Sequence, residues 1–249
     1  MSREFETVTD VTVIATPEQV WEAIATGPGV DSWFMGRNEI EPAVGGKTSM
    51  TLPGLEAMGG TVTEWDPPNR FAMVSDTAPD GSFHAFEYLV EGRAGGSSVV
   101  RVVHHGILSA DGWEMEFDAL RKGDPLYFNT IATYLEHFGG RVGVPVSAWA
   151  PPQQDEAAVW SGWLRSLGLS GSVAAGDPVT ITLPGREPES GVVDSVLEPG
   201  FLGVRTDSGL YRFVGRLGGA GLGHHVFTGE DSESLTAAWT AWLEQTFPA

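Results

Sequence analysis

The feature that most constrains the fold is a long-period repeat. The tetrapeptide Thr-Leu-Pro-Gly begins at Thr51 and again at Thr182, 131 positions further on. Each copy is followed by a glycine, an alternating apolar segment and a proline turn, at residues 60–68 and 191–199. Solenoid repeats have periods of about 20–50 residues, which are far shorter. The sequence therefore predicts two related domains in tandem, and 249 residues suffice for two of ordinary size.

The charge balance excludes several classes of partner. The chain has 14 basic and 33 acidic residues, for a net charge of −19, and no cysteine. A surface this acidic repels nucleic acid and anionic membranes, so we expect neither as a partner. Without cysteine there is no disulfide, thiolate metal site or cysteine nucleophile. No apolar run approaches the roughly 18–20 residues of a membrane span, and the polar N-terminus is unlike a signal peptide. We therefore expect a cytoplasmic protein.

The first half begins with a strand and two helices. Residues 8–15 alternate and are β-branched, which predicts a strand. Thr16 is a natural N-cap, Pro17 fits the first helical position, and Gln19 completes a capping box. A second short helix is expected to carry Trp33 and Phe34. Helical spacing then gives way to a period of two, with strands expected at 47–52, 60–65, 70–75, 82–91 and 97–105.

Two further helices are expected after the meander. Residues 113–121 predict a short helix, and Asp124-Pro125 is expected to cap a longer one. The longer helix places apolar residues on one face, at Phe128, Ile131, Ala132, Leu135 and Phe138. Strands joined by tight turns form an antiparallel meander. A sheet with one apolar face, covered by an amphipathic helix, is a two-layer α+β fold.

Several motifs of the first half resemble one family in the same order. They lie at residues 15–21, Trp33-Phe34, residues 44–47, residues 60–68, His104, and residues 125–127 with 134–135. Residues 8–138 resemble the activator-of-Hsp90-ATPase-like family, within the SRPBCC (START-like, Bet v 1-like) superfamily. The resemblance implies a helix-grip fold, in which a curved antiparallel sheet wraps a long C-terminal helix, often around an apolar cavity. It implies a first domain at residues 1–140.

The second half reads as a shortened copy of the first. Residues 141–152 are expected as a linker, with a short strand at 144–149, and residues 153–249 as a divergent START-like domain. Residues 150–153 and Val159-Trp160 echo the helix start at 15–21, and strands are expected at 176–183, 210–216 and 221–228. The final helix, at 234–247, aligns with the last helix of the first half at an offset of 108. This offset is smaller than 131, so the second copy has lost residues before its final helix. The rival interpretation is an extension that packs on the first domain without a cavity of its own.

Two pairs of adjacent histidines are candidates for metal binding, ligand binding or catalysis. They are His104-His105 and His224-His225, each on an expected strand. Adjacent strand residues point to opposite faces, so the two members of a pair cannot bind one metal ion. If Arg101 faces solvent, His104 faces the cavity, as a pH-sensitive ligand contact, a general base or a hydrogen-bonded wall residue. His84 and His137 do not obviously complete a metal site, so no metal is expected.

The remaining chemical motifs have simpler structural explanations. Glu114, Glu116 and Asp118 form a carboxylate cluster, which could run acid–base chemistry if burial separated their pKa values. Glu114 and Asp118 are neighbours at i and i+4 and would repel if both were charged, and an exposed acidic helix face explains the cluster more simply. The glycine run at 218–223 lacks the spacing of a nucleotide-binding loop, so we expect a hairpin turn. No serine has a nucleophile-elbow setting, and no catalytic residue is assigned.

The apolar inward set is the remaining candidate for a site. The predicted ligand-binding wall consists of Met50, Met73, Phe86, Tyr88, His104, Trp113, Met115, Tyr127 and Tyr134. The sequence does not settle which residues of the strand at 70–75 face inward, and Met73 is the choice for that strand. Such side chains also form ordinary cores. Pockets of this kind combine apolar walls with a few polar tips, here Tyr88, His104 and Tyr134.

Three functions follow as hypotheses. The first is a protein that binds a small apolar or amphipathic molecule, with no cofactor. The second is a START-like cyclase or hydrolase, which would need His104 and an inward carboxylate that the sequence does not locate. The third is a chaperone or regulatory partner. The tandem repeat predicts an internal pseudo-dimer, hence a monomer or a weak homodimer.

Overall fold

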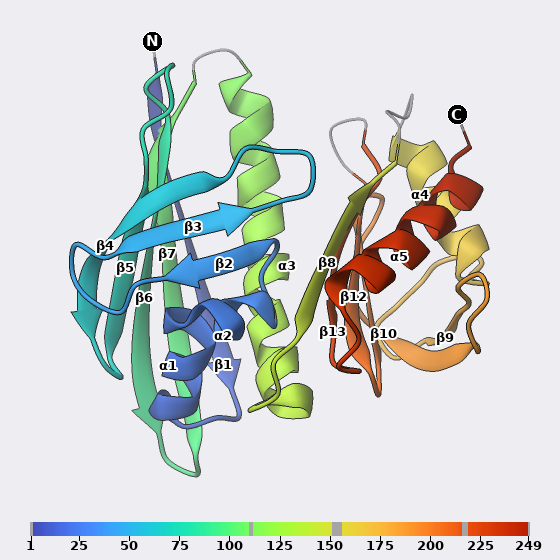
Figure 1. Cartoon of the computed structure of the whole chain (residues 1–249), viewed down its shortest axis with the longest axis horizontal. Coiled ribbons are helices and arrows are strands. Elements are labelled where there is room, and N and C mark those ends of the chain that lie inside the picture. Colours follow the sequence, from blue (N-terminus) through green and yellow to red (C-terminus); the bar gives the residue numbers. More distant parts are fainter. Residues whose placement is uncertain (1, 110–111, 151–155, 216–218, 249) are drawn as a thin grey trace. The chain divides into compact units, whose positions relative to one another are not determined.

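The computed structural model describes residues 2–109, 112–150, 156–215 and 219–248. The chain divides into two compact units, Met1–Val142 and Gly143–Ala249 (Figure 1). Each unit is an antiparallel sheet with helices, as the α+β prediction required. Among the described residues, no helix is long and apolar enough to cross a membrane.

The first unit is a seven-stranded sheet with three helices. Its strands are ordered β1-β7-β6-β5-β4-β3-β2, so the first strand lies beside the last. The elements are β1 (Arg3–Val13), α1 (Pro17–Ala25), α2 (Gly27–Asp31), β2 (Arg37–Ile40), β3 (Lys47–Thr51), β4 (Met58–Asp66), β5 (Arg70–Ser75), β6 (Phe83–Arg93), β7 (Ser97–Leu108) and α3 (Trp113–Phe138). The five expected meander strands are β3 to β7, and β2 is an edge strand that the sequence did not predict.

The first helix begins as its sequence indicates. The Thr16 hydroxyl accepts the N–H of Gln19, and the Gln19 side chain accepts the N–H of Thr16 at 2.9 Å. Pro17 occupies the first turn, where a missing N–H costs nothing. Val20 and Ile24 then lie in the core, so the cap fixes where the buried stripe starts.

The expected break before Pro125 does not occur, and this corrects the prediction. Residues 113–138 form one helix, α3, with Pro125 inside it. Proline leaves the carbonyl four residues earlier without its hydrogen bond, at Arg121. That loss is outweighed because the stripe of Phe128, Ile131 and Tyr134 is buried against the sheet. Asp124 is therefore not a cap, and its side chain is free for other contacts.

The second unit repeats this topology with fewer elements. Its elements are β8 (Val144–Trp149), α4 (Glu156–Ser166), β9 (Pro178–Ile181), β10 (Glu189–Leu197), β11 (Phe201–Thr206), β12 (Gly209–Val214), β13 (Gly221–Val226) and α5 (Ser232–Thr246). The strand order is β8-β13-β12-β11-β10-β9, so again the first strand pairs with the last. The segment expected as a linker thus contains β8, which pairs with β13 along its length. The expected echo at 150–153 and the turn at 218–220 fall partly on residues outside those described.

The 131-residue repeat extends to the backbone hydrogen bonds. Val62 accepts the N–H of Gly45, and Val193 accepts the N–H of Gly176, both at 2.8 Å. The pairing register shifts between Val62 and Glu64 in β4, and between Val193 and Ser195 in β10. A register shift of this kind is typical of a β-bulge, which bends the strand that carries it. The two units are therefore structural copies of each other.

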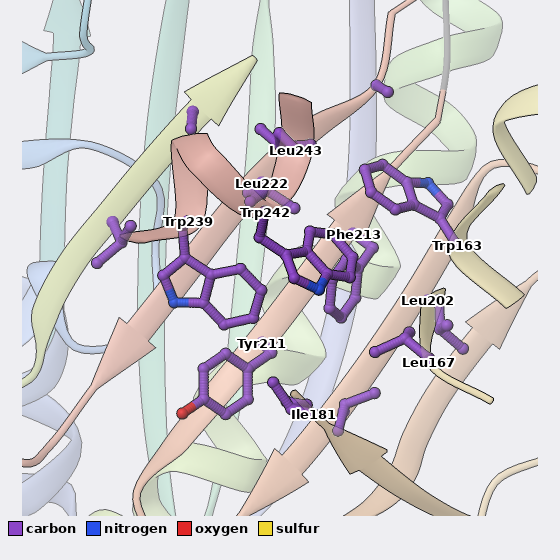
Figure 2. Packing of buried hydrophobic residues seen from close by; sticks show 14 of the residues in the cluster. Trp163, Leu167, Ile181, Leu202, Tyr211, Phe213, Leu222, Trp239, Trp242 and Leu243 are labelled. Atoms are coloured by element: carbon purple, nitrogen blue, oxygen red, sulfur yellow. The ribbon is translucent and has the colours of Figure 1, made fainter. Parts of the chain in front are cut away.

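An aromatic core holds α4 and α5 against the second sheet (Figure 2). The Trp163 and Trp242 rings stack with centroids 5.8 Å apart, and Trp163 meets Phe213 at 5.3 Å. His224 of β13 lies among these rings, 4.1 Å from the Trp239 ring. Burying such large side chains stabilises the unit by about 1.5–3 kcal/mol each relative to exposure.

Candidate functional site

Three neighbouring strands of the first unit align polar and aromatic side chains on one face. The register pairs Thr7 of β1 with His104 of β7, and His104 with Phe86 of β6. Directly paired residues point to the same face of a sheet. On β7 this face also carries Val100 and Val102, which are buried with His104. It is the face that α3 covers.

A chain of hydrogen bonds crosses this buried face. His104 Nδ1 lies 2.8 Å from Asp124 Oδ2 of α3, and the Thr7 hydroxyl donates to the same oxygen at 2.5 Å. On the other side of the ring, His104 Nε2 lies 2.9 Å from His84 Nδ1 of β6. The His104 and Asp124 side chains are only 4% and 12% exposed. Four elements, β1, β6, β7 and α3, thus meet through Thr7, His84, His104 and Asp124.

The Asp124 carboxylate determines how the protons are arranged. An ionised carboxylate only accepts, so His104 carries its proton on Nδ1. Burial, followed by the neighbouring His104, lowers the pKa of His84 to about 4, so His84 is neutral at pH 7. In the arrangement in which His104 is also neutral, His84 donates from Nδ1 to His104 Nε2. The lone pair of His84 Nε2 then remains, and no described residue bonds it. The chain therefore ends in a hydrogen-bond acceptor on a half-buried ring.

Aromatic rings enclose the two histidines. Phe86 stacks on His104 with centroids 4.1 Å apart, and the edge of Phe5 meets His104 at 5.0 Å. Phe5 also contacts His84, at 5.4 Å. Further along the same face, Phe34 packs against Phe86 at 6.3 Å and against Tyr127 at 5.6 Å. The ionisable chain thus lies in apolar surroundings, which strengthen its hydrogen bonds.

The predicted wall residues of the sheet share this face. Register pairs Met73 with Phe86 and with Val62, which is buried, so the inward phase assigned to Met73 agrees with the pairing. Met50 pairs with Met58, two residues from the Thr48–Gly60 pair on the same face. Tyr88 is buried, and burial raises the pKa of its hydroxyl. The ligand role of these residues stays a prediction.

The predicted residues of α3 do not all lie together. Tyr127 contacts Phe34, whereas Met115 is 62% exposed. The Tyr134 hydroxyl donates to the carbonyl of Arg141 at 2.9 Å, so it holds the end of the helix. Trp113 stacks on Phe117 near the start of α3. Tyr127 is connected to the histidine chain through the ring contacts of Phe34 and Phe86.

Thr7, His84 and Asp124 were not predicted as site residues. Asp124 was assigned to a helix cap because Asp-Pro is a common helix start. His84 lies two residues before Phe86 on β6 and therefore points to the same inward face. The alternation of β6 could have identified His84 as an inward residue. Thr7 preceded the expected strand, which in fact begins at Arg3.

The other motifs have structural roles. Asp118 forms ion pairs with Arg121 at 3.0 Å and Lys122 at 2.7 Å on the surface of α3, as an acidic helix face should. Among the described residues, no group of three or more acidic or histidine side chains is arranged to hold a metal ion. His224 Nδ1 accepts the backbone N–H of Arg212 at 3.0 Å, so that histidine is tied to its own sheet.

Comparison with known proteins supports the family resemblance. Residues 14–136 match the family described as activator of Hsp90 ATPase homolog 1-like protein. The first unit belongs to this family. The matched range runs from the residue after β1 to the last turn of α3, so it includes every strand of the meander and His84, His104 and Asp124. None of the curated proteins matches the sequence.

Several solved structures are similar to the chain at low identity. The chain is 13% identical to the di-domain ARO/CYC BexL from the BE-7585A biosynthetic pathway, with 99% of each chain covered and a TM-score of 0.47. It is 17% identical to DynU16 of the dynemicin biosynthetic locus, with 96% of each covered and a TM-score of 0.45. It is 18% identical to the Aha1 dimer from Colwellia psychrerythraea, over 55% of this chain and 98% of that chain, with a TM-score of 0.43. Likenesses this distant assign no activity, because one fold hosts many functions.

The tandem START-like arrangement follows from this chain's own topology. Both units pair their first strand with their last, shift register at equivalent positions, and end in a helix on the sheet. In the second unit the counterpart of His104 is His224, also on the last strand and also facing the helix.

Proposed function

We propose that the first unit binds a small apolar or amphipathic molecule between its sheet and α3. The observation that supports this most is the buried chain Thr7–Asp124–His104–His84 among aromatic rings. Burying ionisable groups costs free energy unless each is hydrogen-bonded. A fold stabilised by packing alone gains little from such a chain, and buried, perturbed groups gather at functional sites. The chain thus serves to present one polar atom in apolar surroundings.

The polarity of that atom indicates the kind of ligand. His84 Nε2 accepts a hydrogen bond when both rings are neutral, so a hydroxyl or N–H group of the ligand would bind it. A second polar atom on the inward side of β1, Thr9 Oγ1, is buried and has no hydrogen-bond partner among the described residues. Its hydroxyl can donate to or accept from a ligand. The ligand we propose is therefore an apolar body with one or two polar groups.

Native mass spectrometry of the purified full chain, with a denatured control, tests the proposal. We expect a small-molecule adduct that is lost on denaturation and is weakened by His84→Ala. The matched control is His105→Ala, which removes the same side chain from the opposite face of β7. An equal loss in both variants, or retention of the adduct in His84→Ala, would contradict the proposed site. A clean unliganded mass would be followed by titration with 8-anilinonaphthalene-1-sulfonate, and unchanged dye binding in His84→Ala would reject the site.

A second candidate, an acid–base enzyme of the cyclase or hydrolase kind, is favoured by the His104–Asp124 pair. His84 Nε2 would take a proton from the bound molecule. His84 would then pass its Nδ1 proton to His104 Nε2, leaving the positive charge on His104 beside the Asp124 carboxylate. A carboxylate that orients and stabilises a protonated histidine is a familiar catalytic arrangement. The distinguishing measurement is the mass of the adduct before and after incubation: a changed mass that depends on Asp124 favours the enzyme, and an unchanged mass favours binding.

A further inference from the structure

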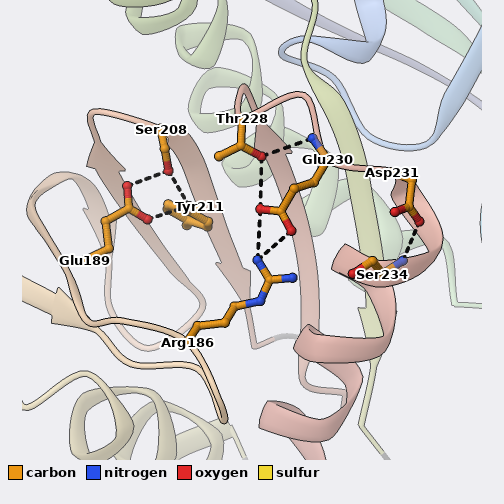
Figure 3. A network of polar contacts seen from close by, with 8 residues as sticks. All are labelled: Arg186, Glu189, Ser208, Tyr211, Thr228, Glu230, Asp231 and Ser234. Atoms are coloured by element: carbon orange, nitrogen blue, oxygen red, sulfur yellow. Dashed lines mark hydrogen bonds and ion pairs between the residues drawn. The ribbon is translucent and has the colours of Figure 1, made fainter.

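The second unit contains a pocket of about 270 Å³ between its sheet and α5. Figure 3 shows the polar side chains at this end of the unit. One wall is apolar and comes from both layers, with Ile181 of β9, Val226 of β13, and Leu235 and Trp239 of α5. The Trp239 and Tyr211 rings meet there, with centroids 5.3 Å apart. A cavity of roughly 150 Å³ is enough to admit benzene, so this pocket admits one ring with a short chain.

The charges that line the pocket do not balance. They are one arginine and three carboxylates, at Arg186, Glu187, Glu189 and Glu230. Arg186 forms an ion pair with Glu230, with Nη1 and Oε2 2.8 Å apart. That ion pair joins the β9–β10 loop to the β13–α5 loop. Glu187 and Glu189 are left without a cationic partner among the described residues.

Glu189 is held in a fixed position inside the pocket. The Ser208 hydroxyl donates to Oε1 at 2.5 Å, and the Tyr211 hydroxyl donates to Oε2 at 2.9 Å. Burial raises the pKa of Tyr211, and the negative charge of Glu189 adds to this, so the phenol keeps the proton that it donates. A carboxylate has about four acceptor sites, and these two bonds use half of them. A positioned negative charge therefore remains available beside two aromatic rings.

We infer that this pocket binds a small primary amine with a single-ring or similarly compact apolar body. The ammonium group would donate to Glu189, forming a charge-assisted hydrogen bond, while the body lies against Trp239 and Leu235. The ring faces of Tyr211 and Trp239 also attract a cation. The inference concerns the second unit alone and does not depend on what the first unit binds.

The experiment is calorimetric titration of the full chain with three molecules of similar shape, at about 150 mM salt to screen the general acidity of the surface. Phenethylamine carries the ammonium group, 2-phenylethanol replaces it with a hydroxyl, and 3-phenylpropionate replaces it with a negative charge. We expect saturable one-site binding of phenethylamine, at least tenfold tighter than 2-phenylethanol, and no binding of 3-phenylpropionate. Equal affinity for the amine and the alcohol, or no saturable amine binding at millimolar concentration, would overturn the inference.

Variants locate the binding. Glu189→Gln keeps the shape and removes the charge, so the tenfold preference for the amine should disappear. Glu244→Gln is the matched control, because it removes the same charge from the exposed side of α5 and should change nothing. If both variants weaken binding equally, the amine responds to surface charge and the inference fails.

Leu235→Phe adds volume inside the pocket while leaving Glu189 unchanged, and it should reduce binding of the amine and the alcohol alike. Unchanged binding in Leu235→Phe would place the amine elsewhere.

Discussion

Removing the Asp124 side chain tests the histidine chain as a structural unit. Asp124→Ala leaves two donors without an acceptor, the Thr7 hydroxyl and His104 Nδ1. A buried donor left unpaired costs about 1–3 kcal/mol. Thr7 is half-buried and can turn to water, so it contributes near the low end, whereas the His104 side chain is 4% exposed and contributes more. We expect a loss of about 3 kcal/mol in the free energy of unfolding of the first unit.

The free energy of unfolding of Asp124→Asn should lie between those of the wild type and Asp124→Ala. An asparagine oxygen can accept from both donors, so the geometry survives and only the charge is lost. Hydrogen bonds to charged groups are stronger than neutral ones by about 1 kcal/mol each. Relief from burying a charge offsets part of that difference. We therefore expect a loss of about 1 kcal/mol for this variant.

The assay is hydrogen exchange read by mass spectrometry in increasing urea, because two units need not unfold in one transition. Peptides from β7 and α3 report on the first unit, and peptides from β13 and α5 report on the second. The matched control is Asp118→Ala, which removes a carboxylate from the surface of the same helix and should leave exchange unchanged. If Asp124→Ala and Asp118→Ala behave alike, the reasoning that unpaired donors on the buried face are costly is wrong.

Three further outcomes are expected in the first unit. Because its folded-state pKa is lowered from 6.5 to about 4, His84 supports stability above pH 6.5 that is lost as pH falls toward 4, by roughly 3 kcal/mol. His84→Gln should remove this pH dependence of the free energy of unfolding in urea titrations. Gly106→Ala should cost about 2–3 kcal/mol, since a Cβ would collide with the carbonyl oxygen of Phe83; a thermal shift within error would contradict this. Thr16→Ala should cost about 1 kcal/mol through the lost bond to Gln19, seen as faster amide exchange in α1 alone.

Much of the fold could be predicted because its signals are local. The capping box at Thr16 and Gln19 specifies a helix start through neighbours three residues apart. The meander strands alternate, and proline or glycine turns separate them, so β5 begins and ends where the pattern predicts, at Arg70 and Ser75. The repeat added what local patterns cannot, since it identified β10 by its likeness to β4.

The site was harder to predict because its contacts are distant in sequence. Asp124 meets Thr7 across 117 positions, and His84 meets His104 across 20, through strand register. Register depends on the whole sheet, and a single shift reverses the facing of every side chain. The continuity of α3 was decided by packing on the sheet, which outweighs the local preference of Asp124-Pro125 for a helix start.

The equivalent register shifts, after Val62 and Val193, are a feature that the two sheets share. The bend of the sheet lies before the point where the spacing between the copies shortens, so both copies inherited the same curved scaffold. The side chains between sheet and helix differ between the two units. In the first unit a hydrogen-bonded histidine chain lies under α3. In the second unit Trp239 packs against His224, and a pocket lies between the sheet and α5. One architecture thus holds two different interiors in a single polypeptide.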